Sequence, residues 1–232
     1  MKRHVFFAAL LLCAAFAFSQ DISLESVCSD LSKNGITKGD FLQSKTIAKT
    51  GKKLSSNGKF IFSTEGILWN TLKPFTSTLV LGADYMVQIG SDGNKKVVDA
   101  RGNDAFKSVS STLLAVFSND VSRLGQNFTL VFETFGKNTW TVSLEPKDKT
   151  VASVMSSIVL KGKTESGNSE ITDIVLNEAK GGSVFYAFTN QSHPKELSED
   201  EKSYFNLQES GRDYKYQYEF ANAVCWFKCF CT

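Results

Sequence analysis

The alternation of apolar and polar side chains along the chain is clearest across residues 58–75. Phe60 and Phe62 are two positions apart, so both point to the same side of an extended chain, and Trp69 continues the pattern in the next apolar run. A short turn separates the two runs, and Pro74 ends the second. The segment therefore predicts two antiparallel strands with Phe60, Phe62 and Trp69 on an apolar face.

The same kind of pattern recurs on both sides of this segment. Residues 41–47 also look extended, and short turns rich in Gly, Asn and Asp separate the apolar runs, which favours antiparallel neighbours. The predicted strands are Leu54–Ser63, Gly66–Leu72, Thr76–Leu81, Tyr85–Ile89, Lys95–Asp99, Phe128–Thr134, Thr139–Leu144, Ser157–Leu160, Ile171–Leu176 and Ser183–Thr189.

Two segments have helical rather than strand periodicity. The first predicts a short helix that Ser23 caps and Gly35 closes, because apolar residues recur at helical spacing at Leu24, Val27, Cys28 and Leu31. The second predicts a helix over Ala105–Phe117, with an apolar stripe formed by Phe106, Val109, Leu113, Val116 and Phe117.

The order of these elements is helix, β meander, helix, β meander. It predicts a mainly β fold with one antiparallel sheet and with helices packed on one face. Val151–Ser156 is compatible with helix or strand, and the charged run Glu196–Lys202 is interpreted as a solvated loop.

The first residues have the three parts of a secretory signal peptide: a basic start, an apolar run over Val5–Ala17, and small residues before Gln20. We expect cleavage after Ser19. A membrane anchor is the alternative, although the run is short for a membrane span. Lipidation at Cys13 is a third reading, although Leu12 stands where a lipobox has a small residue.

Charge and cysteine content narrow the function classes. The chain has 26 basic and 24 acidic residues, and the signal contains only basic ones, so the mature chain is nearly neutral and nucleic-acid binding is not expected. Three cysteines, Cys225, Cys229 and Cys231, lie in the tail, where they do not form a disulfide framework or a regular zinc motif. The role of the tail, residues 207–232, stays open.

The sequence offers no catalytic constellation. His193 is the single histidine after the signal, and it stands in a polar loop, which argues against Ser-His-Asp and histidine–metal chemistry. The glycine-rich turns lack the helix and lysine of a phosphate-binding loop. We therefore expect no enzyme activity, no metal and no cofactor. A secreted enzyme is kept as a rival.

Several short motifs, in this order and spacing, resemble the LolA-type family of periplasmic outer-membrane lipoprotein carriers. The resemblance covers residues 24–206 and is carried by Phe41–Lys45, Ser56–Phe60, Gly66–Trp69, Lys73–Phe75, Trp140, Leu144–Lys147, Ser157–Leu160, Ile171–Ile174 and Phe188–Asn190.

The resemblance implies an incomplete antiparallel β-barrel with a helical lid over an apolar cavity. It implies a monomeric periplasmic chaperone that binds lipoprotein acyl chains, receives them from an inner-membrane ABC transporter complex and passes them to an outer-membrane receptor. A related lipid-binding module, or one that senses mislocalised lipoprotein, is the alternative.

Site residues follow from the resemblance and from the apolar patterns together. We expect Phe60, Phe62 and Trp69 to line the cavity, although ordinary core packing explains these rings equally well. Lid residues are expected at Phe106, Val109, Leu113 and Phe117. Lys73, beside Pro74, stands where the family keeps a basic residue that tunes transfer. The expected domains are a signal peptide at 1–19, the half-barrel at 20–206 and the extension at 207–232.

Overall fold

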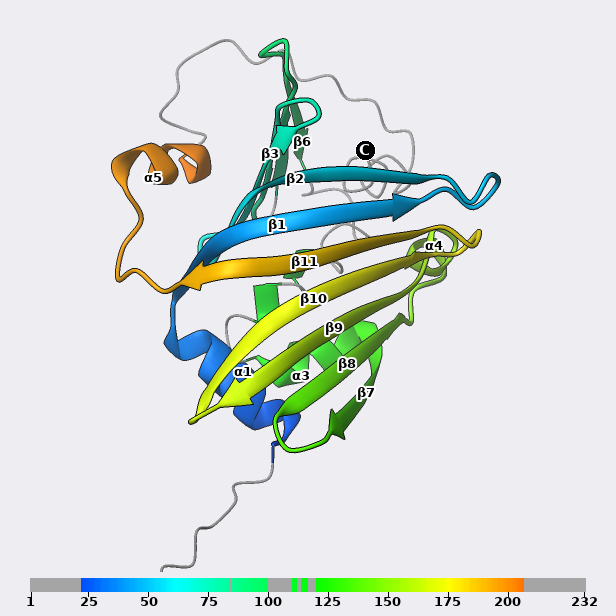
Figure 1. Cartoon of the computed structure of the whole chain (residues 1–232), viewed down its shortest axis with the longest axis vertical. Helices are drawn as coiled ribbons and strands as arrows, with labels where there is room; N and C mark the ends of the chain where they lie inside the picture. The colour runs from blue at the N-terminus through cyan, green and yellow to red at the C-terminus, as the bar shows by residue number, and fades with distance from the viewer. Residues whose placement is uncertain (1–21, 84, 100–109, 112–113, 117–119, 207–232) are drawn as a thin grey trace, which may run out of the picture.

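The computed structural model describes residues 22–83, 85–99, 110–111, 114–116 and 120–206. Its strands form one 11-stranded antiparallel sheet with β6 and β7 at its two edges (Figure 1). The sheet is open rather than closed into a barrel, and the predicted fold class, a mainly β half-barrel, is confirmed. The predicted signal peptide and tail lie outside the described residues.

The first meander contains the six strands between α1 and the predicted second helix. Every predicted strand of this half is present, with ends that differ by a residue or two. They are β1 (Ile36–Thr46), β2 (Lys53–Ser63), β3 (Ile67–Lys73), β4 (Ser77–Leu81), β5 (Tyr85–Ile89) and β6 (Lys95–Asp99).

The second meander contains five longer strands. The ambiguous stretch 151–156 divides between helix and strand, because α4 (Lys149–Ala152) ends shortly before β9 begins. The strands are β7 (Phe128–Phe135), β8 (Thr139–Pro146), β9 (Met155–Glu165), β10 (Asn168–Glu178) and β11 (Ser183–Ser192).

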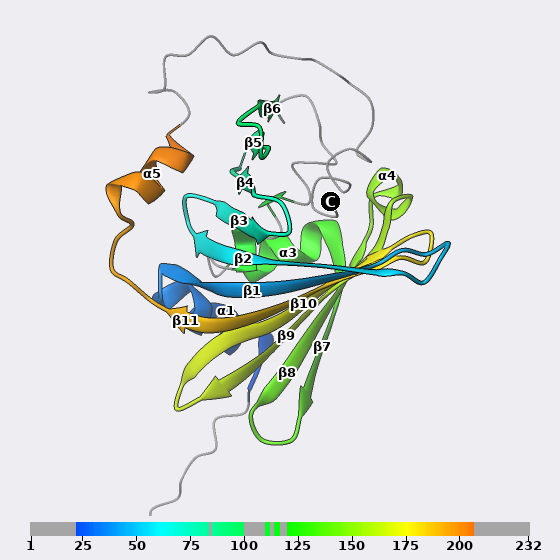
Figure 2. The ribbon, with the colours of Figure 1, turned by 45° about the horizontal axis from the view of Figure 1, so that its top comes forward.

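The first and last strands of the chain join the two meanders. β1 pairs with β2 on one side and with β11 on the other, and both pairings are antiparallel. Figure 2 shows the two meanders fanning out on either side of β1 and β11. One continuous sheet results, and its curvature creates a concave inner face.

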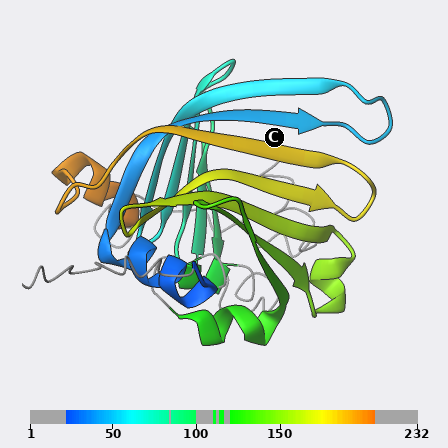
Figure 3. The same cartoon turned by 60° about the horizontal axis from the view of Figure 1, so that its bottom comes forward.

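Helices α1 (Leu24–Lys33) and α3 (Val121–Asn127) lie inside the curve of the sheet (Figure 3). The predicted start of α1 is confirmed, because the Ser23 hydroxyl accepts a hydrogen bond from the backbone N–H of Ser26 at 3.2 Å. Val27, Cys28 and Leu31 are buried against the sheet. The amphipathic pattern of α1 thus closes one part of the inner face.

The predicted helix over Ala105–Phe117 is described only in part. Residues 110–111 and 114–116 are helical, and Ala115 and Val116 are buried in the same core as α1. Phe106, Val109, Leu113 and Phe117 lie outside the described residues.

One helix lies on the opposite face, which corrects two expectations from the sequence. α5 (Glu199–Phe205) packs through Phe205 against the outer side of the first meander, where it meets Ile61 and Leu68. The stretch that was interpreted as a solvated loop therefore contains the start of a helix, and the helices occupy both faces. The sequence pattern did not indicate this helix, because charged side chains surround the few apolar residues through which α5 contacts the sheet.

Polar contacts fix α5 to the sheet. The Lys38 ammonium on β1 lies 2.8 Å from the Glu201 carboxylate. The Tyr85 hydroxyl donates to the Phe205 carbonyl at 3.1 Å.

In the described part of the chain, no helix is long and apolar enough to cross a membrane.

Close packing in the second meander depends on a glycine opposite a tryptophan. Trp140 on β8 faces Gly162 on β9, and its indole is 1% exposed. A Cβ at Gly162 would come within 3.0 Å of both the indole and the Glu170 carbonyl oxygen. The ring fits only because Gly162 has no side chain.

We therefore expect Gly162→Ala to lower the free energy of unfolding by about 1–3 kcal/mol, the usual effect of overpacking a core. Gly125→Ala on α3 is the matched control, since its nearest neighbour beyond the helix would be Leu130 at 3.9 Å. Alanine favours a helix over glycine by about 1 kcal/mol, so the control should be neutral or stabilising. Urea unfolding measures both, and equal stability of the two variants would contradict this account of the packing.

Candidate functional site

The inner face of the sheet holds a cluster of aromatic rings at the centre of the molecule. Phe60 and Phe62 have ring centroids 4.6 Å apart, and Trp69 lies 5.4 Å from Phe62. All three predicted site residues are at most 5% exposed and belong to one core. The structure thus brings Phe60, Phe62 and Trp69 together on the face that α1 and α3 cover.

Three further rings belong to the cluster and were not selected as site residues from the sequence. Phe41 on β1 and Tyr186 on β11 have centroids 5.9 Å apart, and Phe188 lies 4.7 Å from Phe60. The pairing of β1 with β11 brings them to the first meander. The alternation of apolar and polar residues in Ser183–Ser192 indicated that Tyr186 and Phe188 share a face. The sequence alone did not show which strand lies beside β11.

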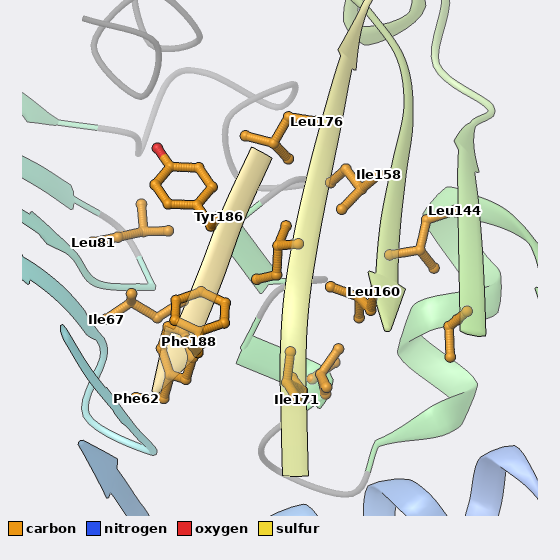
Figure 4. Close-up of a cluster of buried hydrophobic side chains, with 14 of the residues drawn as sticks. Phe62, Ile67, Leu81, Leu144, Ile158, Leu160, Ile171, Leu176, Tyr186 and Phe188 are labelled. Carbon is orange, nitrogen blue, oxygen red and sulfur yellow. The ribbon is translucent and has the colours of Figure 1, made fainter. Parts of the chain in front are cut away.

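The apolar surface continues from the rings across the second meander. Figure 4 shows Ile158 and Leu160 of β9 beside Ile171 and Leu176 of β10, with Phe62 and Phe188 on the side of the first meander. All are buried. The inner face is therefore one apolar surface that spans both halves of the sheet.

The helices sit closely on this surface. One space beneath α1 and α3 measures only about 10 Å³, and apolar side chains line it, including Leu31, Leu124 and Trp140. Such a space has no room for a ligand. In the structure described here, the helices themselves occupy the place over the second meander.

A larger cavity opens at the other end of the aromatic cluster. Its volume is about 250 Å³. Its lining residues come from β1 to β5, from β11 and from the turns after β3 and β5: Phe41, Gln43, Ser56, Trp69, Thr71, Pro74, Phe75, Thr76, Ser77, Leu79, Gln88, Ser91 and Tyr186.

The turn with Lys73 and Pro74 lies at the mouth of this cavity. Pro74 follows a cis peptide bond and lines the cavity together with Phe75, whose ring is 77% exposed. Lys73, directly before Pro74, is exposed. Pro74, one of the two predicted transfer residues, thus lies beside a cavity, and Lys73 precedes it in the chain.

The histidine is the one group that could suggest catalysis. His193 Nδ1 lies 3.1 Å from the Thr37 hydroxyl, and its Nε2 lies 4.0 Å from the Glu170 carboxylate. Thr37 is only 6% exposed, and neither it nor His193 lines the 250 Å³ cavity. The cluster therefore lies apart from that cavity.

Metal chemistry finds no support in the part of the chain that is described. There, no three side chains of His, Cys, Asp or Glu gather closely enough to hold a metal ion. The inner face offers apolar surface and neutral hydrogen-bonding groups.

Fold and site together define a half-barrel protein whose apolar inner face is covered by helices. The sequence matches the profile of the outer membrane lipoprotein carrier protein LolA over residues 33–204. The match extends over most of the chain, and the protein belongs to the LolA family, a family of carriers.

Among solved structures, similar chains include a LolA superfamily protein from Nitrosomonas europaea, with 8% identity and a TM-score of 0.43 over 76% of this chain and 94% of that one. Another is a domain from Vibrio parahaemolyticus assigned to outer membrane lipoprotein sorting, with 10% identity and a TM-score of 0.42 over 79% and 99%. The family assignment rests on the sequence match. No curated protein matches the chain.

Cys28 on α1 reports whether the helix lies on the sheet. It is 1% exposed, and burial, with a smaller contribution from Glu25, raises the pKa of its thiol to about 11. The thiolate is the reactive form, so this pKa alone lowers the reactive fraction at pH 8 by about a hundredfold relative to an ordinary cysteine.

We therefore expect iodoacetamide at pH 8 to alkylate Cys28 at least about a hundredfold more slowly in the native protein than in urea. Peptide mapping by mass spectrometry separates Cys28 from the cysteines of the tail. Similar rates in both conditions would mean that α1 does not stay on the sheet.

Proposed function

We propose that this protein is a periplasmic chaperone that binds the acyl chains of lipoproteins and carries them from the inner to the outer membrane. The observation that carries the proposal is the continuous apolar inner face, which is covered by helices and not by a second sheet. Membership of a carrier family supports the same reading. Binding and release require no covalent chemistry.

The energetics favour a protein that wraps its cargo. Apolar surface exposed to water costs about 0.8 kcal/mol per CH₂ group, so several long acyl chains cost tens of kcal/mol. The 250 Å³ cavity is below the usual size of a site for even one drug-sized ligand. In this proposal, cargo takes the place of the helices over the inner face.

Displacement of α1 is energetically reasonable. Each of its buried apolar side chains loses about 1.5–3 kcal/mol when exposed, which a bound acyl chain can offset by covering the inner face. The helix makes few other contacts, among them a hydrogen bond of 3.0 Å from Ser169 to Asp30. A cover held mainly by apolar burial can yield to a ligand of the same kind.

The proposed partners follow from the family. Cargo comes from an inner-membrane ABC transporter complex and leaves to an outer-membrane receptor, with the protein acting as a monomer. The proposed location is the periplasm, to which the predicted signal peptide directs the chain, and the proposed role there is in outer membrane biogenesis. Phe60, Phe62 and Trp69, with lid residues from the predicted second helix, form the proposed acyl-chain site.

Native mass spectrometry of protein purified from its own periplasm tests the proposal. We expect a fraction of the molecules to retain lipoprotein, and Cys28 to be alkylated faster in that fraction because α1 has left the sheet. An unrelated periplasmic protein, purified in parallel, is the control. Absence of acyl cargo, together with failure to release lipoprotein from inner-membrane vesicles, would refute the carrier function. Cargo that is bound but never passed on would instead indicate a sensor.

Lys73 provides a second prediction, because it precedes Pro74 at the mouth of the cavity. Removal of its charge in Lys73→Leu should favour acyl chains at the mouth, so that lipid is retained more strongly and transfer slows several-fold. The effect is modest because an exposed charge contributes at most about 1 kcal/mol. Transfer of labelled lipoprotein to an outer-membrane acceptor measures it.

Lys137→Leu is the control for this measurement, since Lys137 is equally exposed but lies in the turn between β7 and β8. If Lys73→Leu transfers and retains cargo as the native protein does, Lys73 is an ordinary surface lysine.

A further inference from the structure

Along each of several strands, the side chains on the inner face change from apolar to polar, and the change occurs at neighbouring positions in the sheet. On β1, Phe41 is followed two positions later by Gln43, and on β3 Trp69 is followed by Thr71. β4 runs in the opposite direction, and there Ser77 precedes Leu79. Residues two apart share a face of the sheet, so these polar side chains form a band at the edge of the aromatic cluster.

The 250 Å³ cavity lies across this change. Phe41, Trp69 and Leu79 form its apolar side, and the polar band forms the other. Among the described residues that line it, none carries a charge. The nearby Lys73 is exposed and is not one of them.

Gln43 is the most buried member of the polar band. It is 8% exposed, and its side-chain carbonyl accepts a hydrogen bond from the Ser56 hydroxyl on the neighbouring strand. A buried amide is stable only when its polar atoms have partners. The pair therefore sets a fixed amide and hydroxyl beside an apolar surface.

The neutral side chains of the cavity suit an ester or amide group better than a phosphate at the point where acyl chains join the polar part of a lipid. Ester and amide carbonyls are neutral acceptors, which hydroxyl and amide donors can satisfy. A phosphate loses much of its hydration in such a cavity and needs a cation or several N–H donors in return. The cavity therefore favours lipids whose acyl chains are attached through ester or amide groups with no phosphate nearby.

We propose that the polar band of Gln43, Thr71 and Ser77 binds the ester and amide carbonyls at which acyl chains join their polar part, with the Ser56 hydroxyl orienting the Gln43 amide. The chains then extend over the aromatic cluster, and phospholipids, which carry a phosphate close to that junction, are disfavoured. This specificity rests on the proposed acyl-chain carrier function. It would keep the carrier from filling with the phospholipid that surrounds its cargo in the membrane.

Vesicles that contain three lipids with identical palmitoyl chains test the proposal. The lipids are a lipopeptide with a diacylglyceryl cysteine, a diacylglycerol and a phosphatidylglycerol, in equal amounts. The protein is incubated with the vesicles and recovered, and mass spectrometry counts each bound lipid. We expect the lipopeptide and the diacylglycerol to exceed phosphatidylglycerol at least tenfold. The ratio of lipopeptide to diacylglycerol distinguishes the two neutral sources.

Two variants probe the polar band directly. Thr71→Lys places an ammonium in the cavity. It should lower the ratio of bound lipopeptide to bound phosphatidylglycerol about tenfold. Ser56→Ala removes the hydroxyl beside Gln43 and should weaken lipopeptide binding about threefold. Ser55→Lys and Ser55→Ala are the matched controls, because Ser55 is exposed on the outer face of β2, the strand that carries Ser56. Neither control should change the lipid ratio or the binding of lipopeptide.

The outcomes separate this proposal from the carrier function. Equal uptake of all three lipids, or a preference that Thr71→Lys leaves unchanged, overturns the specificity while the carrier function stands. Uptake of no lipid at all overturns both.

Discussion

The pairing of β1 with β11 is the interaction on which the rest of the structure depends. Without it, the chain would form two separate meanders, each with one apolar face that neither could cover. The register sets Phe41 opposite Phe188 and Gln43 opposite Tyr186, so side chains from the two ends of the domain meet in one cluster. Eight residue pairs hold this junction, with an irregularity between Lys38 and Asp40.

The joined sheet has two apolar faces that are used differently. The inner face carries most of the core, and the helices over it contact it largely through apolar side chains. Among the described residues, those that cover the outer face lie over the first meander, where Lys38 and Tyr85 also bond α5 to the sheet. The polar contacts of α5 lie on the outer face, while α1 contacts the inner face largely through buried apolar side chains.

Much of the fold could be predicted because period-two alternation is strong in both meanders. Phe60, Phe62 and Trp69 were found in this way, and α1 was found from its apolar stripe and its Ser23 cap. The position of α5 was not found, because Leu197 and Phe205 stand among charged residues and give no periodic signal. Phe188 and Tyr186 could not be assigned to the site, because strand pairing between distant segments leaves no local trace in the sequence.

The polar band was missed for a related reason. Gln43, Thr71 and Ser77 are unremarkable polar residues within their own strands, and only the register aligns them. A site composed of one residue from each of several strands becomes visible when the sheet is assembled.

The unpaired edges of the sheet have a mechanical consequence. In a closed barrel, strand number and shear fix the radius, and a wider interior requires broken ladder hydrogen bonds. Here β6 and β7 end the ladder on either side. The separation of these two edges can change through small adjustments of twist between successive strands, with every backbone ladder intact. The interior volume can thus change by bending of the sheet, without the loss of any ladder hydrogen bond.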